Sequence, residues 1–187
     1  MGILNMTRHA LVLGGARSGK TAFAESLALR SGSTPVYVAT AEVLDGEMRD
    51  RVASHQAGRA GQFATIEEPL ALSTTLIKAA RSHDVILVDC LTLWITNLLI
   101  AGENVSEKVE RLSDTLGQLD GTRVILVSNE VGLGIVPDNA MARTFRDLAG
   151  SAHQRLADIC DDVYFVIAGL PMTLKGEPPI PTMGLPQ

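Results

Sequence analysis

One short segment restricts the possible folds of this chain more than any other feature. It reads Gly14-Gly15-Ala16-Arg17-Ser18-Gly19-Lys20-Thr21 and matches the pattern GxxxxGK[ST] in full. A hydrophobic run, Ala10 to Leu13, precedes it, and a segment with helical periodicity, Thr21 to Arg30, follows it. A glycine-rich turn between a strand and a helix presents backbone N–H groups at the helix N-terminus, where they bind phosphate. The segment therefore predicts a phosphate-binding loop on an α/β fold.

The residue types around this loop predict a nucleotide and its metal ion. Lys20 is expected to reach the terminal phosphates, and the hydroxyl of Thr21 to bind Mg²⁺. Asp89 follows the predicted strand Val85 to Val88, where such proteins place the acidic residue that holds the metal. An aspartate there can also cap the next helix. Asn129 and Glu130 stand at the end of another predicted strand. They are either substrate contacts or turn residues, and the sequence does not separate the two.

Hydrophobic runs alternate along the chain with segments of helical periodicity, which predicts a mostly parallel sheet flanked by helices. The five expected strands are Ala10 to Leu13, Val36 to Ala39, Val85 to Val88, Val124 to Val127 and Val163 to Ile167. The expected helices are Thr21 to Arg30, Leu70 to Arg81, Leu91 to Ala101, a helix capped by Ser106 that runs to about Leu119, and one between Asn139 and Ile159.

Composition limits the size and the partners of the molecule. A chain of 187 residues suits one domain, expected over residues 1–175, with a proline-rich tail over 176–187 that is extended or disordered. The net charge of −5 argues against nucleic acid and anionic membrane surfaces as partners. No run is long enough to span a bilayer, and no secretory signal is evident. The two cysteines lack metal spacing, so we expect a cytoplasmic protein.

A second candidate for chemistry lies in the charged segment Asp45 to Arg59, which reads as a helix. Arg51, His55 and Arg59 stand at i, i+4 and i+8 and therefore share one face. Cationic neighbours disfavour protonation of an imidazole, and a neutral imidazole can attack phosphorus. A solvated surface histidine is the alternative, and the spacing alone does not separate the two.

Longer stretches, taken in order from about Leu11 to Lys175, resemble one known family. They are Gly14-Gly15-Ala16-Arg17-Ser18-Gly19-Lys20, Tyr37-Val38-Ala39-Thr40-Ala41, residues 45–59 in the form DxEMxxRVxxHxxxR, Thr65-Ile66-Glu67-Glu68-Pro69, Val88-Asp89-Cys90-Leu91-Thr92, Thr96-Asn97-Leu98-Leu99, residues 128–137 and residues 145–156. This chain of motifs resembles the bifunctional adenosylcobinamide kinases and adenosylcobinamide-phosphate guanylyltransferases of cobalamin biosynthesis.

The resemblance implies two reactions on one RecA-like P-loop domain. A kinase step transfers the γ-phosphoryl group of ATP or GTP to adenosylcobinamide. A transferase step then attaches GMP from GTP to adenosylcobinamide phosphate and releases pyrophosphate. The family's covalent GMP carrier falls on His55. Its nucleotide contacts fall on Gly14, Gly15, Ala16, Arg17, Ser18, Gly19, Lys20, Thr21, Ala39, Thr40, Ala41, Gln56, Ala57, Gly58, Arg59, Glu67 and Asp89, with Thr21 and Asp89 as ligands of Mg²⁺.

The resemblance also implies a homo-oligomer, with a trimer as the suggested form. Three features depart from the shared pattern: His153 stands where asparagine is expected, Asp89 where some relatives have glutamate, and the proline-rich tail has no counterpart. Two other functions stay open from the residues alone. One is a P-loop small-molecule kinase without guanylyl transfer. The other is a RecA-like ATPase acting on DNA or protein, against which stand the net charge and only seven aromatic residues.

Overall fold

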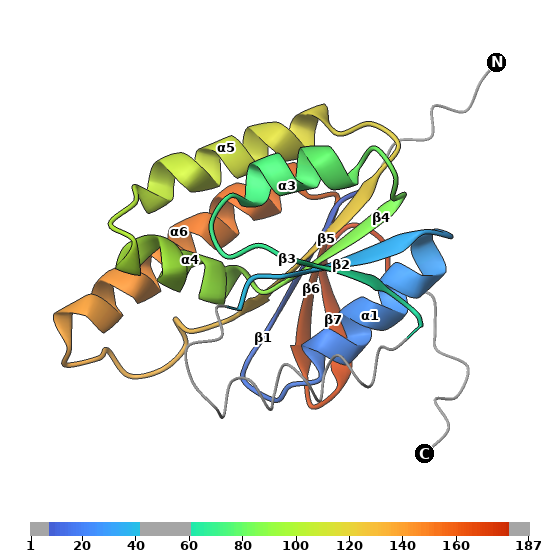
Figure 1. Ribbon diagram of the computed structural model, residues 1–187. Coiled ribbons are helices and arrows are strands. Elements are labelled where there is room, and N and C mark those ends of the chain that lie inside the picture. The colour runs from blue at the N-terminus through green and yellow to red at the C-terminus, as the bar shows by residue number, and fades with distance from the viewer. Residues whose placement is uncertain (1–7, 42–60, 180–187) are drawn as a thin grey trace.

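In the part of the chain that the structure describes, seven strands form one sheet in the order β3-β2-β4-β5-β1-β6-β7. The computed structural model describes residues 8–41 and 61–179 (Figure 1). The strands are β1 Ala10–Gly14, β2 Pro35–Ala39, β3 Ala64–Glu67, β4 Val85–Asp89, β5 Arg123–Asn129, β6 Asp162–Ile167 and β7 Leu170–Lys175. All neighbouring strands pair in parallel except β6 and β7, which form an antiparallel hairpin at one edge. The mostly parallel sheet predicted from the sequence is confirmed.

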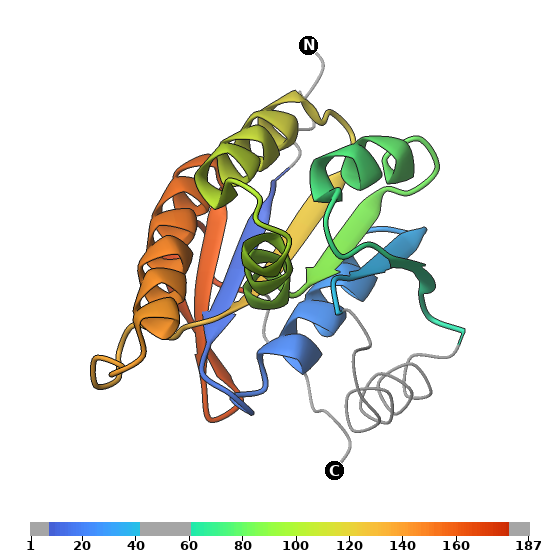
Figure 2. The same cartoon turned by 60° about the vertical axis from the view of Figure 1, so that its left-hand side comes forward.

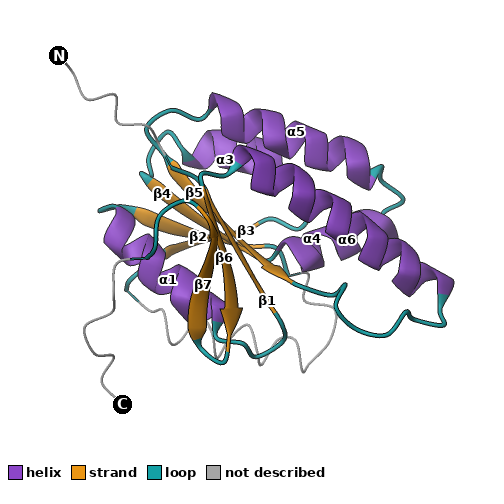
Figure 3. Cartoon of the chain, turned by 180° about the vertical axis from the view of Figure 1, so that it is seen from behind, coloured by secondary structure: helices purple, strands orange, loops and turns teal. Residues whose placement is uncertain are grey.

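Helices cover both faces of this sheet. They are α1 Lys20–Ser31, α3 Leu72–Ala79, α4 Leu91–Ile100, α5 Val105–Gln118 and α6 Ala140–Ile159. Figures 2 and 3 show α3, α4, α5 and α6 together on one face and α1 on the other. Among the described residues, no helix combines the length and the apolar character that crossing a bilayer requires.

The central strands read as continuous hydrophobic runs because both of their faces are buried. In β1, Leu11 and Leu13 pack into the core under the four-helix layer, whereas Ala10 and Val12 pack toward α1. Side chains of a strand alternate between faces, so one apolar run supplies two cores. The sheet is thereby fixed between its helices, and the loops at the carboxyl ends of its strands are free to form a site.

The structure corrects several expectations about these elements. Residues 8–41 and 61–179 contain seven strands rather than five, because β3 and β7 were not predicted. Ser106 does not cap α5; the side chain of Asn104 accepts a hydrogen bond from the N–H of Glu107 at 3.2 Å. The predicted helix Leu70 to Arg81 is shorter at both ends, since α3 spans only Leu72–Ala79. The predicted helix Asp45 to Arg59 lies outside the described residues, as does most of the proline-rich tail.

Strand order decides which loops meet at the carboxyl edge. β5 separates β1, which leads into the phosphate loop, from β4, which ends at Asp89. Neighbouring strands lie about 4.8 Å apart, so the ends of β1 and β4 are about 10 Å apart. Ligands of open α/β sheets bind in the crevice at this edge, and the candidate residues of the described part are located there.

Candidate active site

The phosphate loop connects β1 to α1 and is held tightly at both ends. The carbonyl oxygen of Gly14 accepts a hydrogen bond from the N–H of Glu130 at 3.0 Å, and Gly169 donates to the carbonyl oxygen of Ser18 at 2.8 Å. A Cβ on Gly14 would lie 2.6 Å from both the Ser18 hydroxyl oxygen and the carbonyl oxygen of Val166, so no larger residue fits without a shift. Gly19 has a φ of 92°, which glycine adopts without strain.

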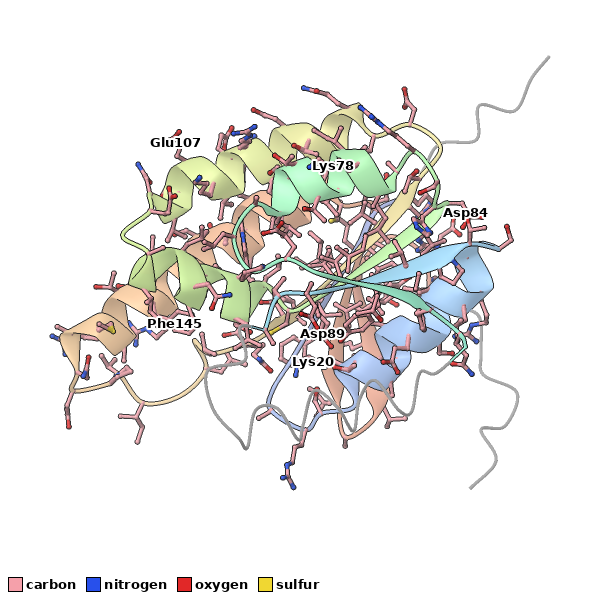
Figure 4. The ribbon with its side chains drawn as sticks, viewed as in Figure 1. Lys20, Lys78, Asp84, Asp89, Glu107 and Phe145 are labelled. Atoms are coloured by element: carbon pink, nitrogen blue, oxygen red, sulfur yellow. The ribbon has the colours of Figure 1, made fainter. Side chains whose placement is uncertain are left out.

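Lys20 is the first residue of α1 and lies across this loop. Its side chain is 8% exposed, and its ammonium group donates to the carbonyl oxygen of Gly15 at 3.1 Å. Figure 4 shows Lys20 and Asp89 on the same side of the molecule, with Asp84 at the opposite end of β4. The ammonium group and the positive end of the α1 dipole together favour an anion at this place. Arg17, also in the loop, is exposed.

Asp89 accepts two hydrogen bonds that join three elements. The hydroxyl of Thr21 on α1 donates to its Oδ2 at 3.0 Å, and the hydroxyl of Tyr37 on β2 donates to the same oxygen at 2.9 Å. The N-cap of α4 is Cys90, and no side-chain cap bond is formed there, so the helix-capping interpretation of Asp89 is wrong. The carboxylate and the Thr21 hydroxyl are oxygen donors of the kind that Mg²⁺ prefers.

Thr40 supports the end of β4 from the neighbouring strand. Its hydroxyl donates to the carbonyl oxygen of Cys90 at 2.7 Å and accepts from the N–H of Cys90 at 2.9 Å. Its own N–H donates to the carbonyl oxygen of Asp89, and its carbonyl oxygen accepts from the side chain of Asn97. Thr40 is fully buried. The structure thus gives Thr40 a supporting role beside Asp89, and a contact between Thr40 and nucleotide stays a prediction.

Asn129 and Glu130 lie at the end of β5, between the phosphate loop after β1 and Asp89 at the end of β4. The side-chain amide of Asn129 donates to the hydroxyl of Thr92 at 2.9 Å. The carboxylate of Glu130 accepts a hydrogen bond from the N–H of Gly132, and its Oε2 lies 3.6 Å from Nδ1 of His153. Burial lowers the pKa of His153, although the nearby carboxylate of Glu130 acts in the opposite direction.

The remaining predicted contacts fall into two groups. Ala39, Ala41 and Glu67 lie at the carboxyl ends of β2 and β3, and the side chain of Glu67 is exposed. β3 is four strands away from β1, so Glu67 lies about 19 Å from the phosphate loop along the edge. His55, Gln56, Ala57, Gly58 and Arg59 lie outside the described residues, and their roles stay predictions.

Sequence reasoning missed two contributors to this site. The hydroxyl of Tyr37 donates to Asp89, whereas the sequence places Tyr37 in a strand and in a shared motif without a role at the site; a phenol within an otherwise apolar strand is a signal that its hydroxyl has a partner. Gly169 supports the phosphate loop from the turn between β6 and β7. No local pattern points to this second contact, because it depends on how a distant hairpin packs.

An apolar groove opens between α4 and α6 in the helical layer. It has a volume of about 390 Å³ and is lined by Thr96, Leu99, Ile100, Asn139, Met141, Ala142 and Phe145. Ile100 and Met141 are 67% and 71% exposed, so the groove is open to solvent. Exposed apolar surface of this kind usually contacts a ligand or another chain.

Comparison with known proteins agrees with this geometry. The sequence matches, over residues 10–174, the family described as cobinamide kinase / cobinamide phosphate guanyltransferase. It is 52% identical to bifunctional adenosylcobalamin biosynthesis protein CobP of Pseudomonas aeruginosa, over 90% of this chain and 98% of that protein. It is 41% identical to bifunctional adenosylcobalamin biosynthesis protein CobU of Salmonella typhimurium, over 88% and 98% of the two chains.

Among solved structures, the flagellar accessory protein FlaH of Methanocaldococcus jannaschii shares the fold. The TM-score is 0.52 at 13% identity, over 91% of this chain and 79% of the other. This likeness confirms the predicted RecA-like P-loop architecture and says nothing further about activity. The residues of the phosphate loop, the strand order and the match along most of the sequence agree, and the chain belongs to the cobinamide kinase / cobinamide phosphate guanyltransferase family.

Proposed function

We propose that this protein phosphorylates adenosylcobinamide with ATP or GTP and then transfers GMP from GTP to adenosylcobinamide phosphate, giving adenosylcobinamide-GDP and pyrophosphate. The observation that carries the proposal is the phosphate loop with Lys20 buried beneath it and Asp89 bonded to Thr21, in a chain of this family. A kinase without guanylyl transfer and a RecA-like ATPase are not favoured, because the named relatives are bifunctional biosynthetic proteins.

In the kinase step, the protein's work is to position the groups and neutralise charge. Backbone N–H groups of the loop hold the phosphates, and the ammonium group of Lys20 stabilises negative charge that develops as the γ-phosphoryl group moves. The acceptor is adenosylcobinamide, a corrinoid, which reacts through the hydroxyl of its aminopropanol arm. No covalent intermediate is needed for this step.

In the transferase step, we assign the nucleophile to His55. A neutral imidazole attacks the α-phosphorus of GTP, the bond between the α-phosphorus and the α–β bridging oxygen breaks, and pyrophosphate leaves. The phosphate of the second substrate then displaces the imidazole from phosphorus. Arg51 and Arg59, one helical turn away on either side in the predicted helix, would keep the imidazole neutral and bind phosphate oxygens.

The residues fit a Mg²⁺ ion bound together with a nucleotide. Among residues 8–41 and 61–179, no group of three or more histidine, cysteine, aspartate or glutamate side chains could hold a metal alone. Mg²⁺ does not need such a group, because it takes one or two protein oxygens and completes its shell with phosphates and water. Thr21 and Asp89 would supply those oxygens. The ion would neutralise charge on the departing phosphates.

Four further properties belong to the proposal. The acceptor is a corrinoid, which is much larger than the nucleotide. Phe145 of the α4–α6 groove lies on the same side of the molecule as Lys20 and Asp89 (Figure 4), so the groove supplies apolar surface for it. A homo-oligomer, with three copies as the suggested form, stays a prediction, as does the lack of nucleic acid binding. We place the protein in the cytoplasm, in keeping with its two free cysteines, Cys90 and Cys160.

The direct test is a product time course followed by mass spectrometry. With adenosylcobinamide, GTP and Mg²⁺, we expect adenosylcobinamide phosphate first and adenosylcobinamide-GDP with pyrophosphate later. With ATP as the only nucleotide, the reaction should stop at the phosphate. Chelation of Mg²⁺ should stop both steps. If adenosylcobinamide phosphate accumulates with GTP and is never converted to adenosylcobinamide-GDP, the protein is a kinase alone and the proposal is refuted.

A further inference from the structure

The residue that follows β5, Glu130, occupies a special place in the sheet. β5 lies between β4 and β1, so its carboxyl end lies between Asp89 and the phosphate loop. The N–H of Glu130 donates to the carbonyl oxygen of Gly14 at 3.0 Å, which fixes Glu130 beside the first residue of the loop. In a kinase built on this edge, the γ-phosphoryl group lies between the loop and the metal-binding carboxylate.

The carboxylate of Glu130 is oriented from two sides and still open to solvent. One oxygen, Oε1, accepts a hydrogen bond from the N–H of Gly132, and the other, Oε2, lies 3.6 Å from Nδ1 of His153. The side chain is 20% exposed. Contacts of this kind fix the direction of a carboxylate without closing it off, and hydrogen bonds of catalytic groups are often long before substrate binds.

His153 is itself held by a contact that faces the core. Its Nε2 lies 2.8 Å from the hydroxyl oxygen of Ser128, the last but one residue of β5. Ser128 is fully buried and His153 is 7% exposed. A carboxylate facing Nδ1 favours the tautomer that carries its proton on Nδ1, with Nε2 accepting from the serine hydroxyl. The imidazole is then a fixed N–H donor aimed at Glu130.

We propose that Glu130 is the general base of the kinase step and that His153, held by Ser128, is a positioning residue that aims its carboxylate. This inference rests on the proposed function. The hydroxyl oxygen of the acceptor attacks the γ-phosphorus, and the bond between that phosphorus and the β–γ bridging oxygen breaks. The nucleoside diphosphate leaves with the electron pair. The hydroxyl proton moves to the carboxylate of Glu130 and is released to water after the products depart.

The two reactions differ in their need for such a base. The acceptor of the kinase step is an alcohol, which must lose a proton. The acceptor of the transferase step is a phosphate, which is already ionised at neutral pH because its second pKa is about 6. Glu130 should therefore matter for the first reaction and not for the second. A substitution that disturbed the phosphate loop would instead lower both.

The test compares Glu130→Gln with wild type in two separate assays. The kinase assay uses adenosylcobinamide, and the transferase assay uses preformed adenosylcobinamide phosphate with GTP. We expect Glu130→Gln to lower kinase kcat by about a hundredfold or more, within the range for loss of a general base, with the KM for GTP unchanged. The transferase rate should stay at the wild-type level. Glu107→Gln, on an exposed glutamate of α5 (Figure 4), is the matched control and should alter neither rate.

Two variants of His153 test the positioning role. Asparagine can still donate an N–H to the carboxylate, so His153→Asn should keep most of the kinase rate, whereas His153→Ala should lower kinase kcat alone. Equal loss of both rates in Glu130→Gln would give Glu130 a structural role, and full kinase activity would place the base elsewhere; either result overturns the inference. A wild-type protein with neither activity would refute the proposed function itself, which is a different result.

Discussion

Replacing Lys20 with alanine is expected to lower the kinase rate and the guanylyl transfer rate together, each by about a hundredfold or more. Lys20 is buried at the start of α1, and its ammonium group lies 3.1 Å from the carbonyl oxygen of Gly15. In the kinase step it would stabilise charge on the transferred and leaving phosphates, and in the transferase step charge on pyrophosphate. A single cation can serve both reactions because the leaving group of each, a nucleoside diphosphate or pyrophosphate, comes from a nucleoside triphosphate bound at the same loop.

Steady-state assays of the two reactions, with Lys78→Ala as the control, check this result. Lys78 is an exposed lysine on α3, away from the loop (Figure 4), and its loss should change neither rate. The melting temperature of Lys20→Ala should be recorded as well, since a buried side chain is removed. A Lys20→Ala protein that is folded and keeps kinase turnover while losing guanylyl transfer would show two separate phosphate sites.

Replacing His55 with alanine should abolish guanylyl transfer and leave the kinase step working. Incubation of wild type with α-labelled GTP and Mg²⁺ should give a protein adduct that survives denaturation, is labile in acid and is stable in alkali, as a phosphoramidate is. His55→Ala should give no adduct. The physical reason is that the transferase step passes through a covalent bond to this imidazole, whereas the kinase step needs none.

A second histidine provides the matched control for this labelling. His83 precedes β4, at the end of the sheet opposite Asp89, and its Nδ1 lies 3.1 Å from the carbonyl oxygen of Thr34. His83→Ala should be labelled as strongly as wild type. If His55→Ala is also labelled fully, the assignment of the nucleophile to His55 is wrong.

Strands covered on both faces could be predicted from the sequence, and strands at the edges could not. The middle of β4, Val85 to Val88, and of β5, Val124 to Val127, is continuously hydrophobic because helices lie on both sides, and both strands were predicted to within two residues at either end. β3 has only four residues, three of them exposed, so it lacks this pattern. β7 contains Pro171, which argues against a central strand but is tolerated at an edge.

The site was predictable where one local pattern contains the chemistry. The phosphate loop is of this kind, since its motif and both flanking segments are contiguous in the sequence from Ala10 to Arg30. The hydrogen bond between Asp89 and Thr21 could not be predicted from the sequence, because strand order decides which strand ends meet. The contact of His153 with Ser128 joins α6 to β5 across 25 residues of sequence, and no periodicity predicts it.

The central claim is that one nucleotide site serves both reactions. Its most direct test is inhibition by a GTP analogue with methylene groups in place of both bridging oxygens, so that neither phosphoryl nor guanylyl transfer can occur. Its inhibition constant, with GTP as the varied substrate, should be measured separately in the kinase and the transferase assay. A shared site predicts competitive inhibition with the same constant in both. Inhibition of one reaction at concentrations that leave the other unchanged would contradict the claim.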